Sequence, residues 1–147
     1  MITISLLGLD PFLAQRVSHD IHKKLVGLFG CHIEDLLVYG SESYLFHDGV
    51  DQTNWHALVH VKAPIRYEKV QASVADYLVK RLQEQVIHIA IEFEYYDPKL
   101  RVASYNPDYP RFVNEANQVE VITPKKHVID EVYQGDVFVD KASKPKK

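Results

Sequence analysis

Residues 1–8, MITISLLG, begin the chain, and in them apolar and polar side chains alternate with a period of two residues. Three aliphatic side chains fall on one side of this stretch, and Thr3 and Ser5 fall on the other. Such a period is typical of a β-strand with one buried face, so a strand is predicted at the very start of the chain. A strand placed there is able to aim a terminal amine into a pocket. The stretch therefore raises the question of whether residue 1 takes part in chemistry.

A helix is predicted next. Asp10 is suited to cap its free N–H groups, Pro11 suits its first position, and Gly30 suits its end. Between these residues an apolar stripe recurs every three or four positions, at Leu13, Val17, Ile21, Leu25 and Leu28. Residues 35–46, DLLVYGSESYLF, then predict a strand with Gly40 as a candidate bulge, and residues 47–54 predict a polar turn.

The same pattern recurs in the second half of the chain. Residues 54–63, NWHALVHVKA, alternate and predict a strand. Pro64 is expected to begin a second helix, whose stripe is Tyr67, Val70, Val74, Tyr77 or Leu78, and Leu82. Residues 86–96, VIHIAIEFEYY, alternate again. The chain thus contains strand–helix–strand twice, and each such unit normally gives a parallel strand pair.

These units predict an α+β fold over residues 1–100, in which duplicated β-α-β units form a four-stranded mixed sheet with two helices on one face. The other face carries polar but not highly charged side chains and needs cover, for which oligomerisation is the simplest source. Residues 101–140 are expected to form a C-terminal arm or extra strands, with short strands at 118–123 and 136–140. The lysine-rich residues 141–147 are expected to be a disordered tail.

Composition narrows the class of protein. A chain of 147 residues fits one domain, and its net charge of −3 leaves no basic excess for nucleic-acid phosphates. No apolar run approaches the roughly 20 residues of a membrane span, and no secretory signal is visible, so no membrane partner and a cytoplasmic location are expected. The single Cys31 forms no internal disulfide and is expected to be a buried or incidental thiol rather than a reactive one. No cofactor motif occurs, so no cofactor is expected.

The doubled unit, the strand at the start and the polar sheet face resemble the tautomerase superfamily, which includes macrophage migration inhibitory factor. Residues 41–64, SESYLFHDGVDQTNWHALVHVKAP, with the helix after them, resemble a small, uncharacterised bacterial branch of it. The resemblance implies a homotrimer with pockets between neighbouring subunits. It also implies that the working residue is an N-terminal proline whose amine is a base or nucleophile. Here residue 2 is Ile2, so Met1 is expected to remain and proline-based tautomerisation is not expected; Met1 is kept as a candidate catalytic amine.

A second cluster of candidates lies around the predicted turn. His47 and Asp48 are candidate catalytic residues, because a general acid or base needs a titratable group at a pocket mouth. Tyr39, Tyr44 and Trp55 are candidate ligand-binding residues that would wall an apolar cavity. The competing interpretation is that Asp48 belongs to a turn and that the aromatic residues pack at an interface.

Two arginines are further ligand-binding candidates. In some tautomerases an arginine near the start of the first helix binds a substrate carboxylate, and Arg16 occupies a similar position. Arg101 lies in the Tyr- and Pro-rich segment, which could fold over a neighbour's pocket, and arginine binds anions in a bidentate manner. The competing interpretation for both is a charge that faces solvent.

Three histidines alternate onto the predicted open face of the sheet. On the axis of the implied trimer, three copies of one histidine would be able to hold a transition metal. Within one chain, His56 and His60 would be about 13 Å apart on one strand, too far to share an ion. We therefore expect His56, His60 and His88 to line a solvated channel, and no metal site is predicted.

The preferred hypothesis is a cytoplasmic trimer of tautomerase type that binds a small, carboxylated or enolisable molecule between subunits. Whether it is an enzyme is left open, and any activity would be isomerase-like without using an N-terminal proline. The alternative is a noncatalytic oligomeric scaffold or binding module, and a weaker alternative is a metal-binding trimer.

Overall fold

The computed structural model describes residues 1–116, which belong to two compact units that divide between Ser104 and Tyr105. The first unit holds every helix and strand described below. In the second, the described residues form turns, and the Arg111 guanidinium lies 4.2 Å from the centre of the Tyr105 ring. The strands predicted at 118–123 and 136–140, and the tail predicted at 141–147, lie outside the described residues.

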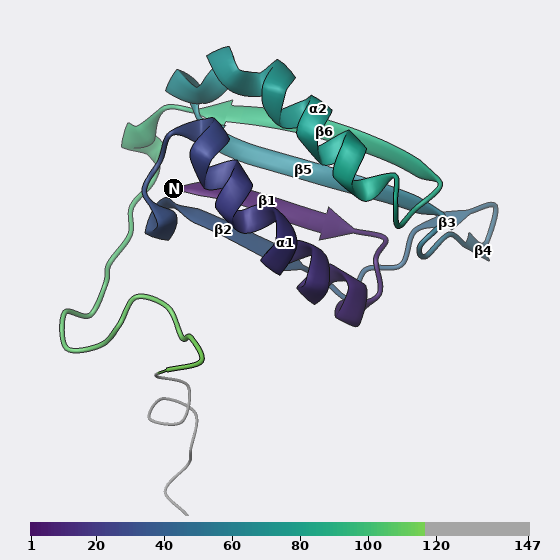
Figure 1. The fold of residues 1–147 in the computed structure, drawn as a ribbon, viewed down its shortest axis with the longest axis horizontal. Coiled ribbons are helices and arrows are strands. Elements are labelled where there is room, and N and C mark those ends of the chain that lie inside the picture. The colour runs from purple at the N-terminus through teal and green to yellow at the C-terminus, as the bar shows by residue number, and fades with distance from the viewer. Residues whose placement is uncertain (117–147) are drawn as a thin grey trace, which may run out of the picture. The chain divides into compact units, whose positions relative to one another are not determined.

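A four-stranded mixed sheet forms the first unit, in the order β2-β1-β5-β6 (Figure 1). Strand β1 (Ile2–Leu7) is parallel to β2 (Leu36–Gly40), and β5 (His56–Pro64) is parallel to β6 (His88–Tyr96). The two pairs meet where β1 and β5 run antiparallel. This arrangement confirms the predicted duplication of a strand–helix–strand unit.

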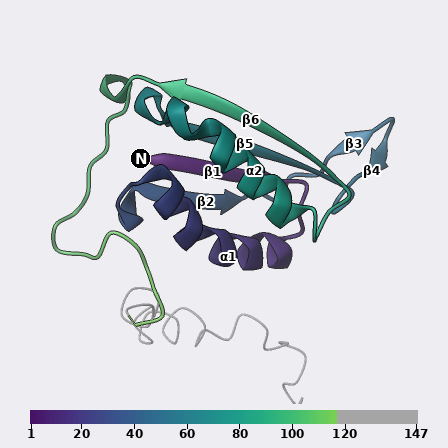
Figure 2. The same ribbon diagram turned by 45° about the horizontal axis from the view of Figure 1, so that its top comes forward.

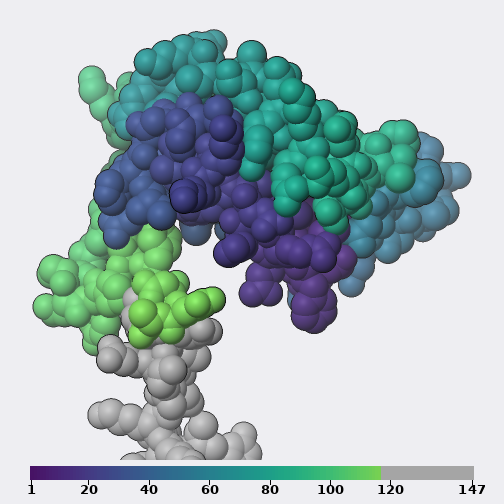
Figure 3. Space-filling model, viewed as in Figure 1, coloured from purple at the N-terminus to yellow at the C-terminus, as the bar shows by residue number. Residues whose placement is uncertain are grey.

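Both helices lie on the same face of the sheet, as the two ribbon views show (Figures 1 and 2), and the space-filling view looks onto this face (Figure 3). Helix α1 (Pro11–Phe29) begins as predicted, because Asp10 Oδ1 accepts a hydrogen bond of 3.0 Å from the Leu13 N–H. Helix α2 (Gln71–Leu82) packs beside it. The alternating apolar residues of the strands face these helices, and the largest fully buried side chains are Ile2, Ile4, Leu6, Ile21, Leu25, Leu36, Leu78, Leu82, Val59, Val61 and Val74. No helix within residues 1–116 is long and apolar enough to cross a membrane.

The second strand is shorter than predicted. It ends at Gly40 rather than continuing to residue 46, and Gly40 is its last residue rather than a bulge. The reason lies in its partner, because β2 pairs only with β1, and that pairing stops at Leu6 opposite Gly40. Residues 41–45 then have no neighbouring strand to bond with and run as irregular chain.

The second helix also begins later than predicted. Pro64 is the last residue of β5, and a 3-10 segment, η2 (Ile65–Val70), precedes α2. Neither Pro64 nor Val70 provides a side-chain cap at the start of these helices. The predicted apolar stripe nevertheless holds, because Tyr67 is buried and packs edge-on against Phe29, with ring centroids 5.6 Å apart.

A short hairpin protrudes beyond the end of the main sheet (Figure 1). It consists of β3 (Phe46–His47) and β4 (Val50–Asp51), which pair antiparallel. Between them Asp48 and Gly49 both have positive φ, as a two-residue hairpin turn requires. The hairpin exposes two apolar side chains, since Phe46 and Val50 are each more than 60% accessible.

Candidate functional site

Strand register places a row of polar side chains on the open face, near the start of β1. Thr3 lies opposite Lys62, and Lys62 lies opposite Glu94. The Lys62 Nζ atom is 2.8 Å from Glu94 Oε1, and His60 Nε2 is 3.6 Å from Glu94 Oε2. Glu94 therefore contacts cationic or protonatable groups through both carboxylate oxygens.

This ion pair fixes the charges of both partners near neutral pH. The hydrogen bond with Glu94 raises the pKa of the Lys62 ammonium, and the hydrogen bond from Lys62 lowers the pKa of the Glu94 carboxyl. Both side chains are about half exposed, so solvent screens the attraction between them. We therefore assign the pair a role in shaping the local charge rather than a large contribution to stability.

Met1 stands at the end of this polar row and is contacted from two segments distant in sequence. The Tyr96 hydroxyl, at the end of β6, donates a hydrogen bond of 2.6 Å to the Met1 carbonyl oxygen. Arg101 Nη2 lies 3.5 Å from Met1 Sδ. A 3-10 turn, η3 (Pro98–Leu100), reverses the chain between these residues, and it is capped by Asp97, which accepts a 3.0 Å hydrogen bond from the Lys99 N–H.

These residues line a cavity of about 630 Å³ that is open to solvent, at the Met1 end of the sheet. Its lining residues are Met1, Thr3, Lys62, Glu94, Tyr95, Tyr96, Asp97, Leu100, Arg101 and Val102. The volume lies within the range of small-molecule sites in proteins. The cavity combines hydroxyl, ammonium and guanidinium donors with the apolar side chains of Leu100 and Val102.

The two cationic side chains that line the cavity, Lys62 and Arg101, differ in their partners. Lys62 is paired with Glu94, and the Asp97 carboxylate caps the 3-10 turn. In the part of the chain that the structure describes, the Arg101 guanidinium forms no ion pair, and its one hydrogen bond is to the uncharged sulfur of Met1. Arg101 is thus the side chain best suited to bind an anion entering the cavity.

Of the candidates predicted from the sequence, the structure brings Met1 and Arg101 into this cavity. His47 and Asp48 lie at the tip of the hairpin, at the opposite end of β1 from Met1 (Figure 1). Asp48 is part of the hairpin turn, and its role as a catalytic residue, like that of His47, stays a prediction.

The aromatic candidates are spread over three places. Tyr44 stacks on Phe46 next to the hairpin, with ring centroids 6.1 Å apart. Trp55 lies edge-on to His88 at the start of β6. Tyr39 is half exposed on the open face of β2. Tyr44 also lines a small pocket of about 210 Å³ beside the start of α1, and neither Tyr39 nor Trp55 is among the residues that line it. The role of the three aromatic residues in ligand binding stays a prediction.

Arg16 lies on α1 and donates a hydrogen bond of 3.0 Å from Nη2 to Gln85 Oε1. With Asp10, Phe12 and Leu13 these residues line a shallow site of about 270 Å³. That site is separate from the cavity at Met1, and the ligand-binding role of Arg16 stays a prediction.

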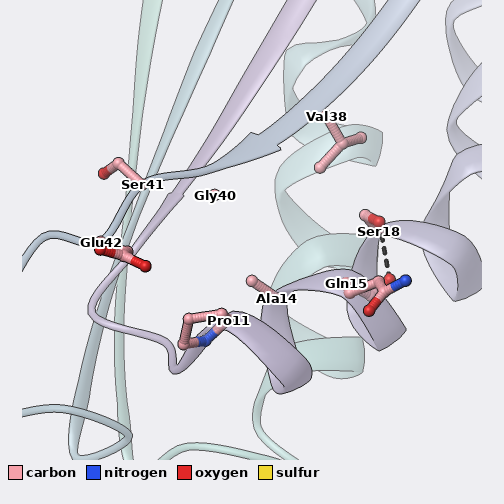
Figure 4. A pocket seen from close by; sticks show the side chains of 8 residues that line it. All are labelled: Pro11, Ala14, Gln15, Ser18, Val38, Gly40, Ser41 and Glu42. Carbon is pink, nitrogen blue, oxygen red and sulfur yellow. Dashed lines mark hydrogen bonds between the residues drawn. The ribbon is translucent and has the colours of Figure 1, made fainter. Parts of the chain in front are cut away.

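A further groove runs between the start of α1 and β2 (Figure 4). It measures about 190 Å³ and is lined mainly by small side chains: Pro11, Ala14, Gln15, Ser18, Val38, Gly40, Ser41 and Glu42. The Ser18 hydroxyl is already engaged, since it donates a 2.7 Å hydrogen bond to the Gln15 carbonyl. Its lining residues include no cation and only one carboxylate, so this groove has fewer groups for binding a charged ligand than the cavity at Met1 has.

Cys31 has the properties of a structural thiol. It is half-buried, and its sulfur lies 4.0 Å from the Val26 carbonyl oxygen. Burial, followed by the nearby Asp35 carboxylate, raises the pKa of the thiol. The reactive thiolate is thereby disfavoured.

Sequence reasoning missed Lys62, Glu94 and Tyr96. Lys62 and Glu94 were visible as polar positions of alternating strands, which is the signal that places them on the open face. Their pairing depends on the register between β5 and β6, which the alternation alone does not specify.

Comparison with known proteins finds similar structures but no similar sequences. No protein-family profile matches the sequence, and no curated protein is similar to it at the sequence level. A domain of unknown function (DUF1904) from Sebaldella termitidis is 14% identical and has a TM-score of 0.61, with 70% of this chain and 95% of that one covered. A protein of unknown function from Vibrio cholerae is 11% identical, with a TM-score of 0.59 and coverage of 69% and 83%.

A third similar structure is a macrophage migration inhibitory factor-like protein from Entamoeba histolytica. It is 17% identical, has a TM-score of 0.55, and covers 71% of this chain and 94% of its own. At such identities the likeness concerns the fold and not the activity. Together with the mixed sheet and its paired helices, it shows that this chain has a tautomerase-like fold of the kind found in macrophage migration inhibitory factor.

Proposed function

We propose that this protein is a homotrimer that binds a small carboxylated molecule in the cavity beside Met1 and lacks proline-based tautomerase chemistry. The observation that carries the proposal is the meeting of Met1, Lys62 and Arg101 around one cavity of about 630 Å³. Residues 1 and 101 are far apart in the sequence, and yet their side chains touch.

A carboxylate fits the donors of this cavity. Arg101 offers a planar set of N–H donors, and its only side-chain hydrogen bond among residues 1–116 is to a thioether. Lys62 adds a second positive group, although Glu94 offsets its charge. The apolar side chains of Leu100 and Val102 would contact the organic part of the ligand.

The trimer is supported by the open face of the sheet. Leu37 and Tyr39 are exposed on the edge strand β2, and Phe46 and Val50 are exposed on the hairpin. An edge strand and exposed apolar residues favour association with another chain. The resemblance to the tautomerase superfamily implies that three copies associate and that pockets form between them.

The chemistry at the cavity would differ from that of a proline tautomerase. None of the residues that line the cavity is a proline, and the first two residues of the chain are Met1 and Ile2. If the Met1 amine acts as a base, it does so as a primary amine. Chemical blocking of that amine would then abolish activity.

Ligand binding is tested by calorimetric titration with phenylpyruvate, an aromatic 2-keto acid. We expect Arg101→Gln to weaken binding roughly 10- to 150-fold, the range expected for loss of a hydrogen bond to a charged group. Lys99→Gln is the matched control, because Lys99 lies in the same turn but does not line the cavity. Equal binding by Arg101→Gln and wild type, or no binding by either, would overturn the proposed site.

A noncatalytic scaffold or binding module is the second candidate, favoured by the exposed Phe46 and Val50 side chains of the hairpin. A turnover assay with phenylpyruvate and dienol substrates separates the two functions. A trimer by light scattering, with no turnover and no ligand bound, would favour the scaffold. A monomer by the same measurement would contradict both.

A further inference from the structure

His56 and His88 form a close pair at the end of the sheet opposite Met1. They are the first residues of β5 and β6, and they lie opposite each other across the parallel strands. Their rings stack, with centroids 4.7 Å apart and planes inclined by 29°. Both residues are exposed, on the face of the sheet that the helices leave open.

Trp55 holds one side of this pair. Its carbonyl oxygen accepts a hydrogen bond of 2.9 Å from the His88 N–H, and its ring lies edge-on to the His88 ring at a centroid distance of 6.1 Å. No hydrogen bond joins the ring nitrogens of His56 or His88 to another residue within 1–116. The two imidazoles are therefore available to an external ligand, and in the implied trimer they would line the solvated channel expected from the sequence.

We propose that His56 and His88 form a two-histidine site for a divalent first-row transition metal, with Cu²⁺ bound most tightly. Imidazole nitrogens suit Zn²⁺, Ni²⁺ and Cu²⁺, and affinity generally peaks at Cu²⁺ in this series. Exposure allows each ring to turn from the stacked arrangement so that one nitrogen of each faces a shared ion. Water completes the coordination, since residues 1–116 contain no cluster of three histidine, cysteine or carboxylate ligands.

The site is separate from the proposed carboxylate site. Lys62 lies six residues along β5 from His56, which corresponds to about 20 Å at the rise of a strand. His60 is about 13 Å from His56 by the same measure and is too distant to be a third ligand. Failure of one site therefore says nothing about the other.

The chain carries its own reporter for this site, because Trp55 is its only tryptophan. The protein is titrated with Cu²⁺ at about pH 7.5, above the ordinary imidazole pKa of about 6.5, in a buffer that does not bind metals. We expect saturable quenching of Trp55 fluorescence. Zn²⁺ competes for the same nitrogens without quenching, and because Cu²⁺ binds more tightly, Zn²⁺ in large molar excess should restore the signal.

Variants assign the quenching to the pair. His56→Gln and His88→Gln should each weaken Cu²⁺ binding on the order of tenfold or more, since even loss of a supporting contact to a metal ligand costs 10- to 100-fold. The double variant should lose saturable quenching, whereas His60→Gln, on the same face of β5, should bind as wild type does. Circular dichroism checks that each variant is folded.

Two results would overturn the metal site. One is the absence of saturable Cu²⁺ binding to the wild-type chain in both fluorescence and calorimetry. The other is retention of wild-type affinity by the folded double variant, which would place the ion elsewhere, for example at the Met1 amine. Quenching of Trp55 reports an ion close to His88, so the titration of the wild-type chain tests the site even if a variant fails to fold.

Discussion

Replacing Gly8 by alanine should destabilise the fold through two separate effects. Gly8 follows β1 with φ of 80°, a conformation that disfavours residues with a Cβ atom. A Cβ atom at this position would also lie 2.4 Å from the His56 carbonyl oxygen and 2.7 Å from Leu45 Cδ1. Leu45 is able to turn aside, but the His56 oxygen belongs to the backbone at the start of β5.

Gly30 separates the two effects, because it also has a positive φ but has open space where a Cβ atom would lie. It ends α1 with φ of 64°, and a Cβ atom there would meet nothing within 4 Å. Gly30→Ala should therefore cost only the left-handed conformation, about 1–2 kcal/mol. Gly8→Ala should add the cost of overpacking, about 1–3 kcal/mol, for a total of roughly 2–5 kcal/mol.

The assay is equilibrium unfolding in urea, followed by circular dichroism, for wild type and both variants. We expect both midpoints to fall, with that of Gly8→Ala falling further, at an unchanged dependence of the unfolding free energy on urea. If Gly8→Ala costs no more than Gly30→Ala, the close approach of the β1–α1 turn to His56 is not rigid and the reasoning fails.

Three further predictions test single contacts. Asn54→Gly keeps the positive φ of this residue accessible but removes its hydrogen bonds with Asp10, so thermal unfolding should show a loss of about 1–3 kcal/mol, and an unchanged midpoint would contradict this. Tyr96→Phe removes the donor to the Met1 carbonyl oxygen and should lower the free energy of unfolding in urea by about 0.5–1.5 kcal/mol. An unchanged free energy would mean that water replaces the bond and would contradict this prediction. The Glu94 carboxyl has a pKa below its ordinary value of 4.5, so its ion pair stabilises the fold above that pH and loses its effect as the pH falls below it. Wild type should therefore lose more stability than Glu94→Gln between neutral and acidic pH, and parallel pH profiles would refute this.

The layout of the fold was predictable because it depends on local periodicity. Alternation with a period of two residues indicates which side chains of a strand share a face. Apolar residues that recur every three or four positions indicate the same for a helix. The repetition of both patterns then predicted the mixed sheet and the helices on one side of it. The two errors, at residues 41–46 and at Pro64, fell where an element ended, because its end depends on what lies beside it.

The candidate sites depended on the tertiary structure. Periodicity placed Lys62, Glu94, His56 and His88 on the open face, but only the register of β5 against β6 made them pairs. Likewise nothing local to Met1 indicates that Arg101 returns to its side chain after a 3-10 turn. The amino-acid sequence by itself determined which face each residue occupies, since that follows from the geometry of a single strand. The folded chain alone decided which residues meet, since contacts between distant segments follow from how whole elements pack.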